Sequence, residues 1–219
     1  MKITVADDLI RIHTVITRAI EISIEQSLYF LEQEKLEDNV KEGFINYLNS
    51  LLALFHSHHI VEDEEIFPYF KNKGLKAPYE MMATQHENLL PLLDTFEDSI
   101  KQLNLDFTNT KKIKTLLENL EQLQTAWIPH YQLEEEYLNN QNISNLINQE
   151  EEAKLCHQFG EYAAKHIEQD YLVIPFILYN LSPEQRSLMA EVFPPIVTEK
   201  LVPYEWKEKW QSMSPFLLV

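Results

Sequence analysis

Apolar residues recur at alternating steps of three and four along most of the chain, which is the pattern of amphipathic α-helices. Four long stretches follow it. The first is expected to be capped by Asp7 or Asp8, the second to end between Pro68 and Gly74, the third to begin near Pro78, and the fourth to follow the polar break LDFTNT. Short connections make consecutive helices antiparallel neighbours. The sequence therefore predicts an all-α fold built on an up-down-up-down four-helix bundle.

Histidine and glutamate interrupt the apolar stripes of these helices. His58 and Glu62 lie one helical turn apart in HSHHIVEDEEIFP, and His130 and Glu134 repeat the spacing in the fourth helix. Side chains at positions i and i+4 share a helix face, so each pair can direct an imidazole nitrogen and a carboxylate oxygen to one point. One such pair can also be a hydrogen bond on a helix surface. A carboxylate on a buried stripe, however, is costly unless it is paired or binds a metal.

His13 and His86 replace apolar residues on the first and third helices. Both lie near the N-terminal ends of their helices, whereas the two His/Glu pairs lie toward the C-terminal ends of the other two. An antiparallel bundle then brings all six residues to one level near one end. Histidines that merely fill a core would not be expected to agree in both helical phase and level, although a bundle with hydrogen-bonded core histidines remains the alternative.

This ligand set indicates a class of metal. Four or more imidazoles with two carboxylates suit iron, manganese or zinc, whereas calcium and magnesium prefer shells made only of oxygen. A ferritin-like site needs Glu-x-x-His on two helices, and no histidine here has a glutamate three residues before it. Pro129 removes a backbone donor just before His130, so we expect the fourth helix to bend or restart there.

The C-terminal part is predicted to be a separate helical extension, residues 141–219, packed on a bundle domain of residues 1–140. A fifth helix is expected to run from a cap at Ser144 toward Pro175. The tail VPYEWKEKWQSMSPFLLV is rich in aromatic and apolar residues. Such groups are costly to leave in water, so the tail is expected to pack back on the bundle or to form the contact of a homo-oligomer.

Two further features are expected in the extension. His166 and Asp170 fall roughly on one face of the predicted fifth helix, where they can form a structural pair or supply a ligand. Ser182, Pro183 and Gln185 form a start signal for a sixth helix that reaches Phe193.

Composition excludes several classes of partner. The chain has 18 basic and 35 acidic residues, a formal charge of −17, and no cluster of Lys or Arg, so nucleic acid is not expected to bind. Cys156 is the only cysteine, which rules out an intrachain disulfide and a thiolate zinc cluster. No stretch approaches the roughly 20 apolar residues of a membrane span. A cytoplasmic location is the default expectation.

With these residues identified, the chain resembles the hemerythrin-like, HHE cation-binding family over about its first 140 residues. The resemblance rests on His13, on HHIVEDEEIFP from His58, on QHENL around His86 and on HYQLEEEYL from His130. The later segments YLVIPFILYNLSPEQR and WKEKWQSMSPFLL are similar to the extension of one HHE subgroup.

The resemblance implies a non-haem di-iron centre with Glu62 and Glu134 as bridging carboxylates. It implies four terminal imidazole ligands: His13, His58, His86 and His130. His59 occupies a position where some members of the family offer a further ligand. Oxygen carriers of the family have a histidine four residues after the one that matches His86, and this chain does not. His166 is a candidate to replace it.

Three functions fit these expectations. The first is a protein that binds dioxygen or another small diatomic ligand, or that senses iron and oxygen through the stability of the bundle. The second is a di-iron enzyme: an oxidase, a peroxidase-like protein, or one that repairs nitrosative or oxidative damage. The third uses metal only to hold an interaction domain together. A dioxygen binder needs only a small apolar pocket, which Phe55, Leu89 and Trp127 are expected to line.

Overall fold

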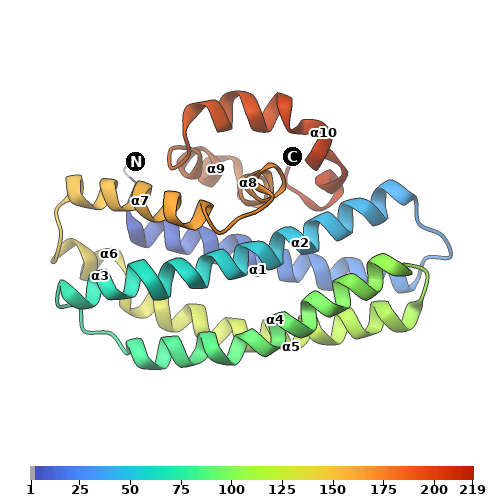
Figure 1. The fold of residues 1–219 in the computed structure, drawn as a ribbon, viewed down its shortest axis with the longest axis horizontal. Coiled ribbons are helices and arrows are strands. Elements are labelled where there is room, and N and C mark those ends of the chain that lie inside the picture. The colour runs from blue at the N-terminus through green and yellow to red at the C-terminus, as the bar shows by residue number, and fades with distance from the viewer. Residues whose placement is uncertain (1–2) are drawn as a thin grey trace.

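The computed structural model describes residues 3–219, all of whose regular structure is helical. Four long helices form the bundle: α1 (Val5–Leu31), α2 (Asp38–Val61), α4 (Tyr79–Leu105) and α5 (Thr110–Tyr137). In Figure 1 these helices run side by side along the longest axis of the molecule, with α4 and α5 on one side. The predicted all-α bundle is confirmed.

The first helix begins earlier than the sequence indicated. Thr4 is the N-cap, and its Oγ1 accepts a hydrogen bond from the backbone N–H of Asp7 at 3.0 Å. The prediction that Asp7 or Asp8 caps the helix is therefore wrong. Both residues lie in the first turn, where their carboxylates face the positive end of the helix dipole.

A change of helical register follows α2. Residues Glu62–Ile66 form a π-helical turn, η1, which leads into α3 (Phe67–Asn72), and the N–H of Phe67 bonds to the carbonyl of Glu62. Pro68 lacks an N–H, and in an α-helix its ring would clash with the carbonyl four residues earlier, so the wider turn accommodates it. The segment then ends at Gly74, whose φ of 92° few other residues adopt.

The fourth helix of the bundle does not restart at Pro129. Helix α5 continues through this proline to Tyr137, and α4 likewise contains Pro91. Each proline leaves one carbonyl without its helical donor, but the apolar stripe on both sides of it holds the helix in place. His130 and Glu134 therefore belong to one continuous helix.

The predicted fifth helix is wrong in its extent. Asn139 caps the short α6 (Asn140–Ser144), and Asn148 caps α7 (Gln149–Ala164), so Ser144 ends a helix and starts none. The chain then breaks before α8 (Asp170–Tyr179), which contains Pro175. His166 and Asp170 consequently do not share a helix. Asparagine satisfies the free N–H groups of a helix start as well as serine does, and this alternative was missed.

The sixth helix agrees better with its prediction. Ser182 caps α9 (Pro183–Ala190) and accepts from the N–H of Gln185, although the helix stops three residues before Phe193. Three short pieces complete the chain: η2 (Val197–Glu205), α10 (Lys207–Trp210) and η3 (Gln211–Phe216).

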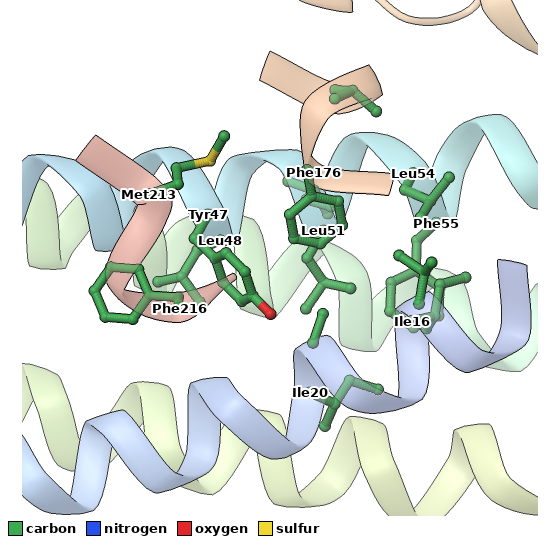
Figure 2. Packing of buried hydrophobic residues seen from close by; sticks show 14 of the residues in the cluster. Ile16, Ile20, Tyr47, Leu48, Leu51, Leu54, Phe55, Phe176, Met213 and Phe216 are labelled. Atoms are coloured by element: carbon green, nitrogen blue, oxygen red, sulfur yellow. The ribbon is translucent and has the colours of Figure 1, made fainter. Parts of the chain in front are cut away.

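The C-terminal tail packs on the bundle, as one of the two predictions for it stated. Helices α7 to α10 lie above α1 and α2 in Figure 1, on the side opposite α4 and α5. Figure 2 shows Phe176, Met213 and Phe216 reaching the core residues of α2, and the rings of Tyr47 and Phe216 are 5.7 Å apart. The Tyr47 hydroxyl also donates to Asn180 Oδ1 at 2.7 Å. This face of α2 is thus buried within one chain.

Within residues 3–219, no helix combines the length and the apolar character that a membrane crossing requires.

Candidate metal centre

Polar residues form one layer between two apolar cores. On every long helix the histidines separate the two apolar clusters. The smaller cluster comes first along α1 and α4, and the larger cluster comes first along α2 and α5. In α4, for example, Met82 belongs to one cluster and Leu89 to the other, with His86 between them. The layer contains seven buried residues: His13, His58, His59, Glu62, His86, His130 and Glu134.

The ligand atoms of these residues converge. They form three groups, in each of which all ligand atoms lie within 4.8 Å of one another. The first group is His13, His58, Glu62 and Glu134, the second is Glu62, His86, His130 and Glu134, and the third is His59, His86 and His130. All six residues that the sequence placed at one level are therefore brought together, and His59 joins them.

Both carboxylates belong to the first and the second group. Glu134 Oε2 lies 3.2 Å from His13 Nε2, whereas Glu134 Oε1 lies 3.3 Å from His86 Nε2. Glu62 Oε2 lies 3.3 Å from His58 Nε2 and 3.5 Å from His86 Nε2. Each carboxylate thus faces imidazoles of both groups, which is the arrangement that a carboxylate bridge between two cations requires.

These separations fit ligands that share an ion better than they fit hydrogen bonds. Two ligand atoms that are each about 2.1 Å from one ion, at angles of about 90–110°, are roughly 3.0–3.4 Å apart. Within the described chain, the layer has buried polar atoms with no hydrogen-bond partner: Nε2 of His13, His58 and His130, both ring nitrogens of His59 and His86, and both carboxylate oxygens of Glu62 and Glu134. Unpaired buried atoms in such number are costly, and coordination of cations would satisfy them.

The buried residues of the layer differ in the direction of their pKa shifts. Burial lowers the pKa values of His58 and His59 far below the usual range. Burial also opposes the protonation of His13, but its contacts with Glu134 and Glu135 prevail and raise its pKa to about 9. Burial and the charge of Glu134 together raise the pKa of Glu62. The site is therefore a mixture of charged and neutral groups whose net charge a cation can alter.

Three imidazoles are held by partners outside the layer. His13 Nδ1 donates to Glu135 Oε1 at 2.9 Å, and His130 Nδ1 donates to Gln85 Oε1 at 3.3 Å. His86 Nδ1 lies 3.0 Å from Asp63 Oδ1. The His86 contact has the distance of an ion pair without the geometry of a hydrogen bond. In a neutral imidazole, a proton held at Nδ1 leaves the lone pair of Nε2 free for a metal, so the hydrogen bonds of His13 and His130 favour the ligating tautomer.

The sequence reasoning missed these partners. Glu135 and Asp63 directly follow Glu134 and Glu62, so each motif has a second acidic residue at the same position. This repetition could have indicated the two partners. No feature of the sequence indicated Gln85. It directly precedes His86 but contacts His130 across the bundle. The described residues provide no outer carboxylate or amide of this kind to His58 or His59.

Aromatic side chains close one side of the layer. The Trp127 ring contacts those of His13 and Phe55, with centroids 5.4 and 5.1 Å apart, and Trp127 Nε1 donates to Thr17 Oγ1 at 2.9 Å. Phe55, Leu89 and Trp127, which were expected to line a small apolar pocket, are all buried. They lie in the larger apolar cluster, which keeps that side of the layer dry.

His166, a candidate ligand from the sequence, and His157 both lie outside the layer. His166 is exposed in the turn after α7, where its ring lies beside Tyr162, and it joins none of the three groups. The break between α7 and α8 is the physical reason, because it removes the helix on which His166 was expected to face the bundle. His157 is exposed as well, and its Nδ1 donates to the carbonyl of Val192 at 3.3 Å.

Of three comparisons with known proteins, one found a match, and that match covers the bundle. No match was found among curated proteins or among solved structures. Residues 4–141, which include the whole ligand layer, match the family model described as the hemerythrin HHE cation-binding domain. This match spans more than half of the chain, so the protein belongs to the hemerythrin HHE cation-binding domain family.

Proposed function

We propose that the layer holds two iron ions, bridged by Glu62 and Glu134, and that the protein binds dioxygen or another small diatomic ligand, or senses iron and oxygen. The observation that carries this proposal is the pair of ligand groups that share both carboxylates. Imidazole and carboxylate ligands in this ratio suit iron, and manganese or zinc can substitute.

The two proposed sites differ in their number of imidazoles. His13 and His58 serve one site, whereas His86 and His130, with His59 beside them, serve the other. The first site therefore has one protein ligand fewer. Bound iron would supply an open coordination position and a change of oxidation state, and the shortage of ligands favours the first site for the incoming molecule.

Protein residues around the layer would control what reaches it. Glu135 would restrain the His13 ring through a hydrogen bond, and Asp63 would restrain the His86 ring through an ion pair, when a small molecule enters. Trp127 and Phe55 exclude water on one side, which lowers the local dielectric and strengthens electrostatic interactions in the layer.

Sensing would follow from the same structure. Metal that binds only the folded chain adds its binding free energy to the free energy of unfolding. All four long helices contribute to the layer, so occupancy would change the stability of the whole bundle end. A cell could read that change as accessibility of the surface or as protein lifetime.

The test begins with elemental analysis of protein made in iron-replete medium, where we expect about two ions per chain. The protein is then reduced without oxygen and exposed to air while its visible spectrum is recorded. A spectral change that reverses when oxygen is removed supports dioxygen binding. Glu134→Gln is the matched control, because it keeps the volume of the side chain but not its charge. One ion or none per chain would refute the two-iron proposal.

A di-iron enzyme is the second candidate, and one observation favours it. A cavity of about 550 Å³ lies between the bundle and the extension, and His58 forms part of its wall. An enzyme acting on a sizeable organic substrate needs such a space beside its metals, whereas a dioxygen binder does not. Irreversible oxidation in the same experiment, accelerated by an organic substrate, would select the enzyme over the binding protein.

A further inference from the structure

The cavity beside His58 has the size and composition of a small-molecule site. Its walls come from both parts of the chain: α1 and α2 of the bundle, and α7, α8, α9 and η2 of the extension. Its volume of about 550 Å³ lies within the usual range of ligand pockets, roughly 300–1,000 Å³. Most lining residues are apolar, among them Leu9, Leu54, Phe159, Ile174 and Trp206. A molecule bound here would be held mainly by apolar burial.

One polar group of the wall has an unused acceptor. Asp8 lines the cavity, and its Oδ1 pairs with Arg11 Nη1 at 2.5 Å. Arg11 Nε is itself engaged, since it donates to Gln185 Oε1 at 2.9 Å. The Cys156 thiol, a weak donor that also lines the cavity, lies against the same carboxyl group. Asp8 Oδ2 is buried and accepts no N–H or O–H hydrogen bond within residues 3–219. A ligand that donates one hydrogen bond would satisfy this oxygen.

Charge at the cavity selects against ionic ligands. Arg11 already pairs with Asp8, so a cationic head group beside Asp8 would be repelled by the guanidinium and would find other carboxylates only at the rim, where water screens them. Glu161 and Asp170 lie on the wall and are exposed, with Lys165 as the single lysine among the lining residues. The chain carries a net charge of −17, which disfavours an anionic head group. An uncharged molecule avoids both penalties.

We propose that this cavity binds an uncharged, apolar molecule that carries a hydroxyl group, and that the hydroxyl donates to Asp8. The long-chain and isoprenoid alcohols and the phenols are the chemical class that fits. His58 is part of its wall, and the other lining residues belong to none of the three ligand groups. Its binding can therefore be tested whether or not the two-iron proposal is correct.

The experiment uses the full chain, with and without added iron. A neutral naphthylamine fluorophore, whose emission rises in apolar surroundings, is titrated into the protein. It is then displaced by dodecanol, by dodecyl methyl ether and by dodecanoate. The ether lacks the O–H donor and the carboxylate carries a negative charge. We expect dodecanol to displace the fluorophore at the lowest concentration, with the ether about 5-fold weaker and dodecanoate at least about 10-fold weaker.

A pair of neighbouring residues provides the matched variants. Val197 lines the cavity, whereas Ile196 is 53% exposed and does not. Val197→Trp should fill the cavity and weaken binding of the fluorophore at least about 10-fold, and Ile196→Trp should leave it unchanged. Circular dichroism checks that both variants fold. Should Val197→Trp not fold, Leu201→Trp on the same wall replaces it.

Several outcomes would overturn the proposal. Absence of fluorophore binding, or equal binding by the Val197→Trp and Ile196→Trp variants, would mean that no ligand enters the cavity. Displacement by dodecanoate as effective as displacement by dodecanol would replace the uncharged ligand with an anionic one. Equal potency of the ether and the alcohol would remove the role given to Asp8.

Discussion

His59 stacks on His86 across the interface of α2 and α4, with ring centroids 4.2 Å apart and ring planes 21° apart. The ring of His130 stands nearly perpendicular to that of His59 at 5.3 Å. Both nitrogens of His59 lack a hydrogen-bond partner in the described chain. This position of His59 is one that a metal ligand would require, and it is unlike that of a hydrogen-bonded core residue.

His59→Ala should consequently weaken one of two metal sites and spare the other. We expect wild-type protein to lose its two ions together when chelator is increased, because the sites share both carboxylates. The variant should release one ion at roughly 10-fold lower chelator concentration than the second. Elemental analysis after graded chelation measures this. If the variant lost metal with the wild-type profile, His59 would not be a ligand.

Removing a shared carboxylate should reduce metal binding more than removing any single imidazole. Glu62→Ala or Glu134→Ala removes a group that both sites use, so both ions should be lost. At free metal about 1,000 times above the dissociation constant, binding stabilises the fold by about 4 kcal/mol. Loss of that term lowers the melting temperature by roughly 8–16 °C in a chain of this size.

Two exposed histidines serve as controls for these variants. His157→Ala and His166→Ala should keep both ions and melt within about 2 °C of wild type, since surface substitutions usually change stability by less than 0.5 kcal/mol. Loss of metal from His166→Ala would restore the ligand role that the sequence suggested. Equal destabilisation by all four variants would contradict the assignment of the bridges.

Much of the site was accessible from the sequence because of two simple regularities. The spacing of His58 and Glu62, repeated by His130 and Glu134, fixes the direction in which both pairs project, and antiparallel order sets the level of His13. What the sequence could not provide depends on packing between segments distant in the chain. Gln85 contacts His130 only because of the way α4 and α5 cross, and the cavity exists only because the extension docks on α1 and α2.

Two features of the local sequence explain why helix boundaries in the extension were predicted wrongly. Ser144 and Asn148 are both good helix caps, and periodicity alone could not choose between them. The apolar residues Leu172 to Leu178 are buried on all sides of α8, so they show no stripe from which a boundary could be read.

The partner of His13 outside the layer provides a test of ligand orientation. Glu135→Gln should keep the fold but weaken the hold on the ring, and a lost partner of this kind typically costs about 10–100-fold in metal affinity. The neighbouring Glu136 is exposed, so Glu136→Gln is the matched control and should bind metal like the wild type. Competition with a chromophoric chelator measures both affinities. Equal affinities in the two variants would show that Glu135 does not orient His13.

A glycine of α2 tests the docking of the tail. A Cβ atom added at Gly43 would lie 1.9 Å from the carbonyl oxygen of Ser212, so Gly43→Ala must displace η3 from the bundle. We expect a cost of about 1–3 kcal/mol in the free energy of unfolding and faster proteolysis within residues 207–216. Glu42→Ala, at an exposed neighbouring position, should change neither. Unaltered stability of Gly43→Ala would mean that the tail is not packed there.

The last prediction concerns removal of the metal. Without cations the imidazoles and carboxylates of the layer pair with one another at separations of 3.2–3.5 Å, and most of these atoms remain without a hydrogen bond in the described chain. The layer must then admit water or retain a desolvation cost of several kcal/mol. We expect this end of the bundle to loosen and the chain to remain folded.

Hydrogen exchange of metal-free against metal-loaded protein measures this difference. Exchange should increase in residues 9–16, 56–66, 82–90 and 127–137, which carry the ligands on all four helices. The opposite end is packed through the larger apolar cluster, which includes Ile20, Leu48, Phe96 and Leu116, and should keep its protection. The start of α7, from Gln149 to Lys154, is the internal control, because none of its residues belongs to the layer. Exchange that is identical in both forms would mean that metal does not organise the bundle, and sensing through its stability would have no physical basis.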